Sequence, residues 1–172
     1  MADTPERHGE AFELGEQLTV VGRKLEPGEQ APEFALEALD EGAMHTVRLA
    51  DSSGKVRVLS VINSLDTPVC HAETHRWEGM QADLPANAIV QTISMDLPFA
   101  QARWKATENV AHQALSAHKD EQFGRDYGVL LKEWRLLQRA VFVIDGEGRI
   151  RYVDYVADQM REPSYDAALQ AA

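Results

Sequence analysis

Three short runs of aliphatic and β-branched residues mark the centre of the predicted fold. They are VRVLSVI at 56–62, AIVQTIS at 88–94 and AVFVID at 140–145. Apolar runs of this length, with little polar alternation, are typical of strands that are buried on both faces of a sheet. The stretches between them favour helices, one over HAETHRWEGMQADL and one that begins near Pro98. Buried strands separated by helices predict an α/β sandwich.

Weaker patterns predict the elements around this centre. After the third run, GEG turns the chain and RIRYVDYV returns as a hairpin partner, which makes the predicted sheet mixed. Further strands are indicated by LTVVGRKL and MHTVRL, and further helices by DEQFGRDYG and PSYDAALQAA. In such sheets, side chains that carry chemistry tend to lie at the C-terminal ends of the central strands.

The first residues of the chain are polar and predict a flexible tail over 1–12. Residues 13–172 contain no repeat, no low-complexity tract and no linker rich in Gly, Pro or Ser, so we expect them to form a single domain. With 172 residues, of which 44% are apolar, the chain is long enough to bury about 70% of its unfolded surface around one core.

The chain is acidic, with a formal net charge of -11. Because affinity for nucleic acids and for anionic membranes comes largely from Lys and Arg, we expect neither as a partner. No apolar run approaches the roughly 20 residues that span a bilayer, and MADTPERHGEAF lacks the basic and apolar regions of a signal peptide. We therefore expect a cytoplasmic protein.

The single cysteine, Cys70, lies in the stretch SLDTPVCHAETH just after the first buried run. Asp66 and Thr67 are both suitable N-caps and Pro68 suits the first helical position, so Cys70 falls in the first turn of a helix. Free N–H groups and the helix dipole favour a thiolate there, but a helix terminus contributes only about 0.3 to 1 kcal/mol, and at most about 2. A strongly reactive cysteine at this position therefore needs an arginine and a hydroxyl near its sulfur.

Two other interpretations of Cys70 remain open on the residues alone. It can be a small buried hydrophobe, as most lone cysteines are, or part of a metal site, because His71 and His75 lie one helical turn apart. HAETH lacks the Glu that directly follows the first His in the zinc-protease pattern, which favours two histidines on a solvated helix face. We therefore assign no metal ligand. With one cysteine, the chain can form no internal disulfide.

Three segments match one family in order and spacing. They are SLDTPVC, DLPFAQARW at 96–104, and RAVFVID together with the hairpin and the EPSYDAAL that follow it. Together they resemble the bacterial thiol peroxidases, a branch of the peroxiredoxins, and the likeness extends from about Gly15 to the C-terminus. The resemblance implies a thioredoxin-like α/β sandwich, with a central mixed sheet flanked by helices and an N-terminal β-hairpin.

The same resemblance implies a thiol-dependent peroxidase that reduces hydrogen peroxide and alkyl hydroperoxides through a sulfenic acid on Cys70. Thr67, three residues earlier, would hydrogen-bond near the sulfur and the peroxide. Arg139 would be the cation that stabilises the thiolate and the charge that develops as the O–O bond breaks. The family implies no cofactor, and its members commonly form homodimers, so we expect a homodimer.

Two positions depart from the family pattern. Asn63 stands where peroxiredoxins usually carry a proline that shields the pocket from water, seven residues before the cysteine. Lys105 stands where relatives place a resolving cysteine, so a second molecule must complete the cycle. We expect this molecule to be a thioredoxin, a glutaredoxin, a low-molecular-weight thiol such as glutathione, or a second copy of the chain.

Two rival functions stay open at this point. A peroxide sensor would use Cys70 for signalling without efficient turnover, which fits the missing resolving cysteine. An inert scaffold would carry an unreactive Cys70, but it would have no need for Thr67 and Arg139 beside the sulfur. Turnover separates the enzyme from the sensor, because an enzyme consumes many equivalents of peroxide and a sensor stops near one.

Overall fold

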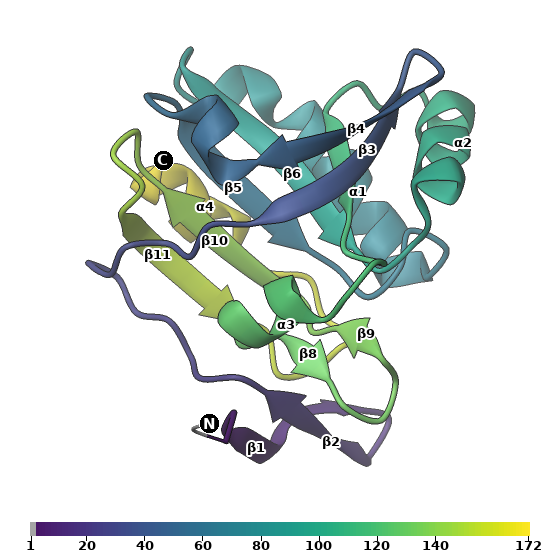
Figure 1. Cartoon of the computed structure of the whole chain (residues 1–172), viewed down its shortest axis with the longest axis vertical. Coiled ribbons are helices and arrows are strands. Elements are labelled where there is room, and N and C mark those ends of the chain that lie inside the picture. Colours follow the sequence, from purple (N-terminus) through teal and green to yellow (C-terminus); the bar gives the residue numbers. More distant parts are fainter. Residues whose placement is uncertain (1–2) are drawn as a thin grey trace.

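A seven-stranded mixed sheet forms the centre of the protein, in a computed structural model that describes residues 3–172 (Figure 1). Its strands are β3 (Ala35–Asp40), β4 (Ala43–Arg48), β5 (Val56–Val61), β6 (Ala88–Ser94), β7 (Gln113–Ser116), β10 (Ala140–Ile144) and β11 (Ile150–Tyr155). The strand order is β11-β10-β5-β6-β7-β3-β4. β5, β6 and β7 run parallel to one another, whereas the other neighbouring pairs are antiparallel. The mixed sheet predicted from the sequence is confirmed.

The three central strands coincide with the three apolar runs. β5 and β10 are buried along their whole length, and β6 is buried over its C-terminal part. Because β5 and β6 are parallel, their C-terminal ends meet at the same edge of the sheet. β10 is antiparallel to β5, with Ala140 opposite Val61, so the residue that precedes β10 lies at this edge too. The topology thus brings the segments after β5, after β6 and before β10 together.

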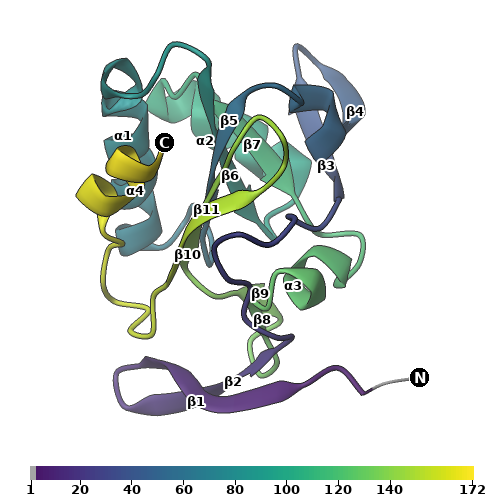
Figure 2. The ribbon, with the colours of Figure 1, turned by 90° about the vertical axis from the view of Figure 1, so that its left-hand side faces the viewer.

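Helices cover both faces of the sheet, as a sandwich requires. They are α1 (Pro68–Gly79), α2 (Pro98–Glu108), α3 (Gln122–Asp126) and α4 (Tyr165–Ala171), with short 3-10 turns at Leu49–Ser52 and Gln81–Asp83. α1 and α4 lie on one face, where Trp77 packs against Tyr165, and α3 lies on the other (Figure 2). No helix within residues 3–172 is long and apolar enough to cross a membrane.

A second, four-stranded sheet contains the N-terminal hairpin that the family resemblance implies. Its strands are β1 (Glu6–Glu13), β2 (Glu16–Val21), β8 (Leu130–Leu131) and β9 (Leu136–Leu137). The prediction of a flexible tail over 1–12 is therefore wrong from residue 6 onward, while residues 1 and 2 lie outside the described part of the chain. The strand is held because Ala11 is fully buried and the Arg7 guanidinium donates to the carbonyl oxygen of Gly128 at 3.0 Å.

Candidate active site

The loop after β5 places the start of α1 at the C-terminal edge of the sheet. Asp96, in the loop after β6, holds this segment: its carboxylate accepts from Ser64 Oγ at 2.7 Å and from the Leu65 N–H at 2.9 Å. Of the two suitable N-caps, Thr67 takes the position, and Pro68 begins the helix. Cys70 consequently lies in the first turn of α1, as the sequence predicts.

The sulfur of Cys70 is enclosed. The residue has 0% exposed surface and belongs to a buried apolar cluster with Ile62, Leu65, Trp104 and Val110. On its polar side, Nη2 of Arg139 donates to Sγ at 3.3 Å. The structure therefore brings together the cysteine and the arginine that the sequence proposes as partners, although they are 69 residues apart.

Arg139 is held in place by three further contacts. Nη1 forms an ion pair with Glu73 Oε2 at 2.6 Å, and Nη2 donates to the Gln159 carbonyl oxygen at 2.9 Å. The Arg139 backbone N–H donates to Gln159 Oε1 at 2.9 Å. Burial acts to lower the pKa of the guanidinium, but the adjacent Cys70 and Glu73 outweigh it and raise the pKa above its usual value. A fixed, permanent positive charge thus faces the sulfur.

Glu73 is a site residue that the sequence reasoning missed. Its carboxyl is completely buried between Arg139 and Ser60, whose Oγ donates to Oε1 at 2.9 Å. Burial raises the pKa of Glu73 above its usual value, and the opposing effects of the Arg139 charge and of the hydrogen bonds from Arg139 and Ser60 do not cancel this. The sequence signal is its spacing: three residues after Cys70 on a helix, Glu73 shares the face that carries the cysteine. The short contact to Arg139 favours the ionised carboxylate.

Thr67 does not contact the sulfur in this conformation. Its Oγ1 donates to the Ser64 carbonyl oxygen at 3.0 Å, and no side-chain bond caps α1. Within residues 3–172, no hydrogen bond joins Thr67 to Cys70. Thr67 itself is half-buried and lies at the start of the cysteine's own helix.

Asn63 and Lys105, the two positions that depart from the family pattern, have different surroundings. Asn63 is buried, and its Nδ2 donates to the Leu137 carbonyl oxygen at 2.7 Å and to Gln159 Oε1 at 3.1 Å. Its Oδ1 lies 4.0 Å from the Cys70 sulfur, so the amide joins the polar network around Arg139. Lys105 lies on α2, where its Nζ is 3.8 Å from an Asp40 carboxylate oxygen.

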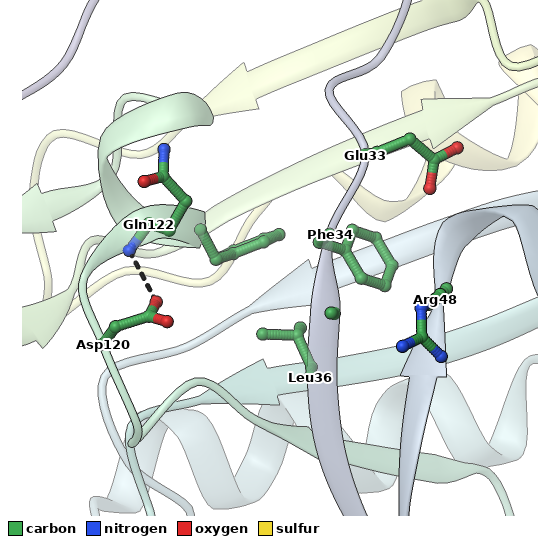
Figure 3. Close-up of a pocket in the computed structure, with 8 residues that line it drawn as sticks. Glu33, Phe34, Leu36, Arg48, Asp120 and Gln122 are labelled. Atoms are coloured by element: carbon green, nitrogen blue, oxygen red, sulfur yellow. Dashed lines mark hydrogen bonds between the residues drawn. The ribbon is translucent and has the colours of Figure 1, made fainter.

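A pocket of about 450 Å³ lies away from this site, between the start of β3 and the start of α3 (Figure 3). Phe34 and Leu36 form its apolar wall, and Arg48 and Asp120 flank it. Neither Cys70 nor its polar partners line this pocket. The volume of a pocket therefore does not identify the candidate active site, which lies at the buried Cys70 sulfur.

Comparison with known proteins identifies the family to which this arrangement belongs. A protein-family model described as the AhpC/TSA family matches residues 27–153. The chain belongs to this family. Two relatives named thiol peroxidase, from Streptococcus sanguinis and Bacillus subtilis (strain 168), are 45% and 43% identical over 159 and 161 residues. Each match covers 92% of this chain, with 95% and 93% of the respective relative.

The solved structure of a similar protein also supports the family assignment. A peroxiredoxin-like protein from Aquifex aeolicus superposes with a TM-score of 0.84 at 32% identity, covering 98% of this chain and 96% of that one. The resemblance to bacterial thiol peroxidases and the peroxiredoxin fold expected from the sequence are both confirmed.

Proposed function

We propose that the protein is a thiol-dependent peroxidase that reduces hydrogen peroxide and alkyl hydroperoxides at Cys70. The observation that carries this proposal is the 3.3 Å contact between Arg139 Nη2 and the Cys70 sulfur in a fully buried site. Membership of the AhpC/TSA family and the names of the relatives support thiol-dependent peroxide reduction. They favour an enzyme with turnover over a peroxide sensor or an inert scaffold.

The first step is a displacement at oxygen. The Cys70 thiolate attacks the distal oxygen of the hydroperoxide, an S–O bond forms and the O–O bond breaks. The bonding electron pair stays with the leaving oxygen, which takes up a proton and departs as water or an alcohol. Cys70 is oxidised to sulfenic acid. Arg139 stabilises the thiolate before the attack and the negative charge on the leaving oxygen during it.

The Arg139 side chain has a donor left for this task. Its Nε–H is buried and has no hydrogen-bond partner within residues 3–172, while its terminal nitrogens are already engaged. A buried donor without an acceptor is costly, and a peroxide oxygen satisfies it. Thr67, once its hydroxyl turns from Ser64, supplies a second donor near the peroxide.

An external thiol completes the cycle, because the chain has one cysteine. A first thiolate attacks the Cys70 sulfenic acid, which gives a mixed disulfide and water, and a second thiol releases reduced Cys70 and a disulfide product. A thioredoxin, a glutaredoxin and a low-molecular-weight thiol all have the necessary chemistry. Lys105 provides no sulfur for this step.

Access to the sulfur requires movement. Cys70 has 0% exposed surface, so neither a hydroperoxide nor a thiol reaches it unless the first turn of α1 or its surroundings open. A pocket of about 240 Å³ flanks this turn and is lined by Pro68, Val69, Ala72, Met160 and Glu162. Its mainly apolar lining suits the alkyl group of an organic hydroperoxide.

We further propose that residues 13–172 act as a single domain together with β1, that the protein works in the cytoplasm, and that it forms a homodimer. The single cysteine, which can form no internal disulfide, and the thiol chemistry of Cys70 are consistent with a reducing compartment. The dimer is inferred from the family resemblance, and sedimentation equilibrium at micromolar concentration tests it.

The experiment that tests the function uses Trp104, which lies in the same buried apolar cluster as Cys70, as an internal reporter. Reduced protein is mixed with one equivalent of hydrogen peroxide or cumene hydroperoxide in a stopped-flow fluorimeter, with Cys70→Ser as the control. We expect a rapid change of tryptophan fluorescence that is lost in Cys70→Ser. A reaction no faster than that of a free thiol would overturn the proposal. Steady-state consumption of peroxide with excess thiol then distinguishes turnover from a single oxidation.

A further inference from the structure

Three potential metal ligands converge beside the active site. His71 and His75 lie one turn apart on α1, and Glu108 is the last residue of α2. Their ligand atoms all lie within 4.8 Å of one another. The sequence offers only the histidine pair, since Glu108 is 33 residues beyond His75 and reaches it through the packing of the two helices.

The separations match those of a tetrahedral zinc site. Glu108 Oε2 lies 3.0 Å from His75 Nε2 and 3.8 Å from His71 Nε2. With metal–nitrogen and metal–oxygen bonds of about 2.0 to 2.1 Å, tetrahedral ligands are about 3.3 Å apart, which lies between these two values. Two imidazoles and one carboxylate form a donor set typical of Zn²⁺, with one position left for water.

Trp104 fixes the orientation of both histidines. The ring centroids of His71 and His75 lie 5.3 and 5.5 Å from the Trp104 ring, against which they pack edge-on or tilted. The ligand side chains remain accessible, since the His71, His75 and Glu108 side chains are 42%, 39% and 31% exposed. The two histidine rings are therefore supported by Trp104 on one side, and the group of three side chains is partly open to solvent on the other.

An ordinary ion pair would not require this arrangement. A single imidazole is enough to pair with Glu108, yet the two rings lie 4.7 Å apart, and both direct Nε2 toward the same carboxylate oxygen. A divalent cation accepts a lone pair from each of the three side chains at once. The convergence of three donor atoms is thus explained by a cation.

We propose that His71, His75 and Glu108 bind a divalent transition metal ion of the Zn²⁺ class and thereby tie α1 to α2. The ion restrains the helix whose first turn carries Cys70, because His71 is the next residue in the chain. The consequence for the reaction rests on the proposed peroxidase function. The bound metal slows the opening of this turn and therefore slows the attack of an external thiol on oxidised Cys70.

Metal binding is tested without reference to activity. ZnCl₂ is titrated by isothermal calorimetry into untagged Cys70→Ser protein, which removes the thiol as a competing ligand. We expect one Zn²⁺ per chain and an affinity that falls by at least about tenfold when His75→Ala or Glu108→Gln is added. His45→Ala is the matched control, since His45 also faces a carboxylate, Asp40, at 3.4 Å, but belongs to no group of three potential ligands within residues 3–172.

Several results of these titrations would overturn the proposed metal site. Equal Zn²⁺ affinity in the Cys70→Ser protein with and without His75→Ala, or no binding at all, would overturn the site. A loss of affinity in His45→Ala as large as that in His75→Ala would also overturn it. In addition, Zn²⁺ at 100 times its Kd should raise Tm by at least about 5 °C only when His75 and Glu108 are present.

The regulatory consequence has a test of its own. Protein with intact Cys70 is oxidised by one equivalent of peroxide, and the rate of its reduction by glutathione is followed with and without Zn²⁺. We expect Zn²⁺ to slow this step severalfold in the natural sequence and to leave His75→Ala unaffected. Equal slowing in both would place the metal effect at the sulfur or on glutathione and overturn the restraint. If the peroxidase function itself fails, Cys70 does not react with peroxide, while the calorimetric result still stands.

Discussion

A buried ion pair, Arg139 with Glu73, lies beside the Cys70 sulfur. Arg139 and Glu73 are almost completely buried, with side-chain exposures of 1% and 0%, and form an ion pair with each other. If one partner of a buried ion pair is removed, the other charge is left uncompensated in an apolar environment. Glu73 therefore holds Arg139 in position against the sulfur and also neutralises part of its charge.

Replacement of Glu73 tests this balance. We expect Glu73→Gln to lower the free energy of unfolding by about 3 kcal/mol or more, because Arg139 loses its buried counter-charge. Urea denaturation at pH 7 measures the change. The apolar double replacement Glu73→Leu with Arg139→Met is the control and should recover much of the loss, since no buried charge remains. A cost below about 1 kcal/mol for Glu73→Gln would mean that its carboxyl is already protonated in the folded protein.

Thr67 provides a case in which rate and stability should separate. Because its side chain does not cap α1 and makes a single hydrogen bond to Ser64, Thr67→Ala should cost only about 1 kcal/mol of stability. If its hydroxyl contacts the peroxide in the transition state, the rate constant for Cys70 oxidation should fall by about 100-fold. Thr67→Ser keeps the hydroxyl and should retain most of the rate. Equal rates for the Ala and Ser variants would argue against the proposed role.

The lone Cys70 should also be prone to over-oxidation. No second cysteine traps its sulfenic acid, so excess peroxide in the absence of thiol should convert it to sulfinic acid and inactivate the protein progressively. Intact-mass spectrometry would follow the change from a one-oxygen to a two-oxygen adduct. Pre-incubation with glutathione should suppress the second addition. A stable one-oxygen adduct under excess peroxide would contradict this expectation.

Among the elements, the N-terminal hairpin depends on a close approach between backbones. Gly128, just after α3, has a positive φ of 64°, and a Cβ there would collide with the Arg23 carbonyl oxygen that follows β2. Gly22 makes the reciprocal approach, since its Cβ would collide with the Arg125 carbonyl oxygen. The two glycines let β2 and the end of α3 pack directly against each other.

Alanine substitutions distinguish this approach from backbone strain alone. Gly42 also has a positive φ, of 80°, but nothing lies within 4 Å of the site where its Cβ would be. We expect Gly128→Ala to destabilise the protein by about 2 kcal/mol more than Gly42→Ala, because overpacking adds to the strain that the two substitutions share. Chemical denaturation of both variants measures the difference. Equal losses would show that the contact with Arg23 relaxes freely.

For the whole molecule, a buried histidine links stability to pH. His112 is 7% exposed, and its Nδ1 and Nε2 lie 2.6 Å from Glu78 Oε2 and 2.8 Å from Thr92 Oγ1. Burial lowers the pKa of His112 below its usual value of 6.5, and the opposing effect of Glu78 does not cancel this. The unfolded chain therefore takes up a proton at His112 at a higher pH than the folded protein does.

The sign of the pH dependence follows directly. Stability is fully present above about pH 6.5 and falls as the pH drops from there toward the lowered pKa, with a slope of up to about 1.4 kcal/mol per pH unit. We expect His112→Gln to remove this part of the slope, as measured by urea denaturation between pH 5 and pH 7.5. The exposed His45→Gln is the matched control for a His-to-Gln replacement outside the core. A slope as steep in His112→Gln as in the natural sequence would rule out His112 as its source.

Local sequence patterns determined the central elements of this protein. The three apolar runs became β5, β6 and β10, and Cys70 fell in the first turn of α1, because burial periodicity, capping residues and proline act over a few neighbouring positions. The local pattern of the sequence did not predict β1. Most of its residues are only partly buried, so it carries little apolar signal, and it is held by pairing with β2 and by Arg7.

Only the tertiary structure decided which side chains meet. Antiparallel pairing of β10 with β5 sets Arg139 beside Cys70, and the turn after β11 adds Gln159. The packing of α2 on α1 brings Glu108 to the histidine pair. These contacts join residues that are 20 to 69 positions apart, beyond the reach of helix and strand periodicity. The sequence therefore determined the cysteine and its helix, while the topology of the sheet and the packing of the helices determined the charges that surround them.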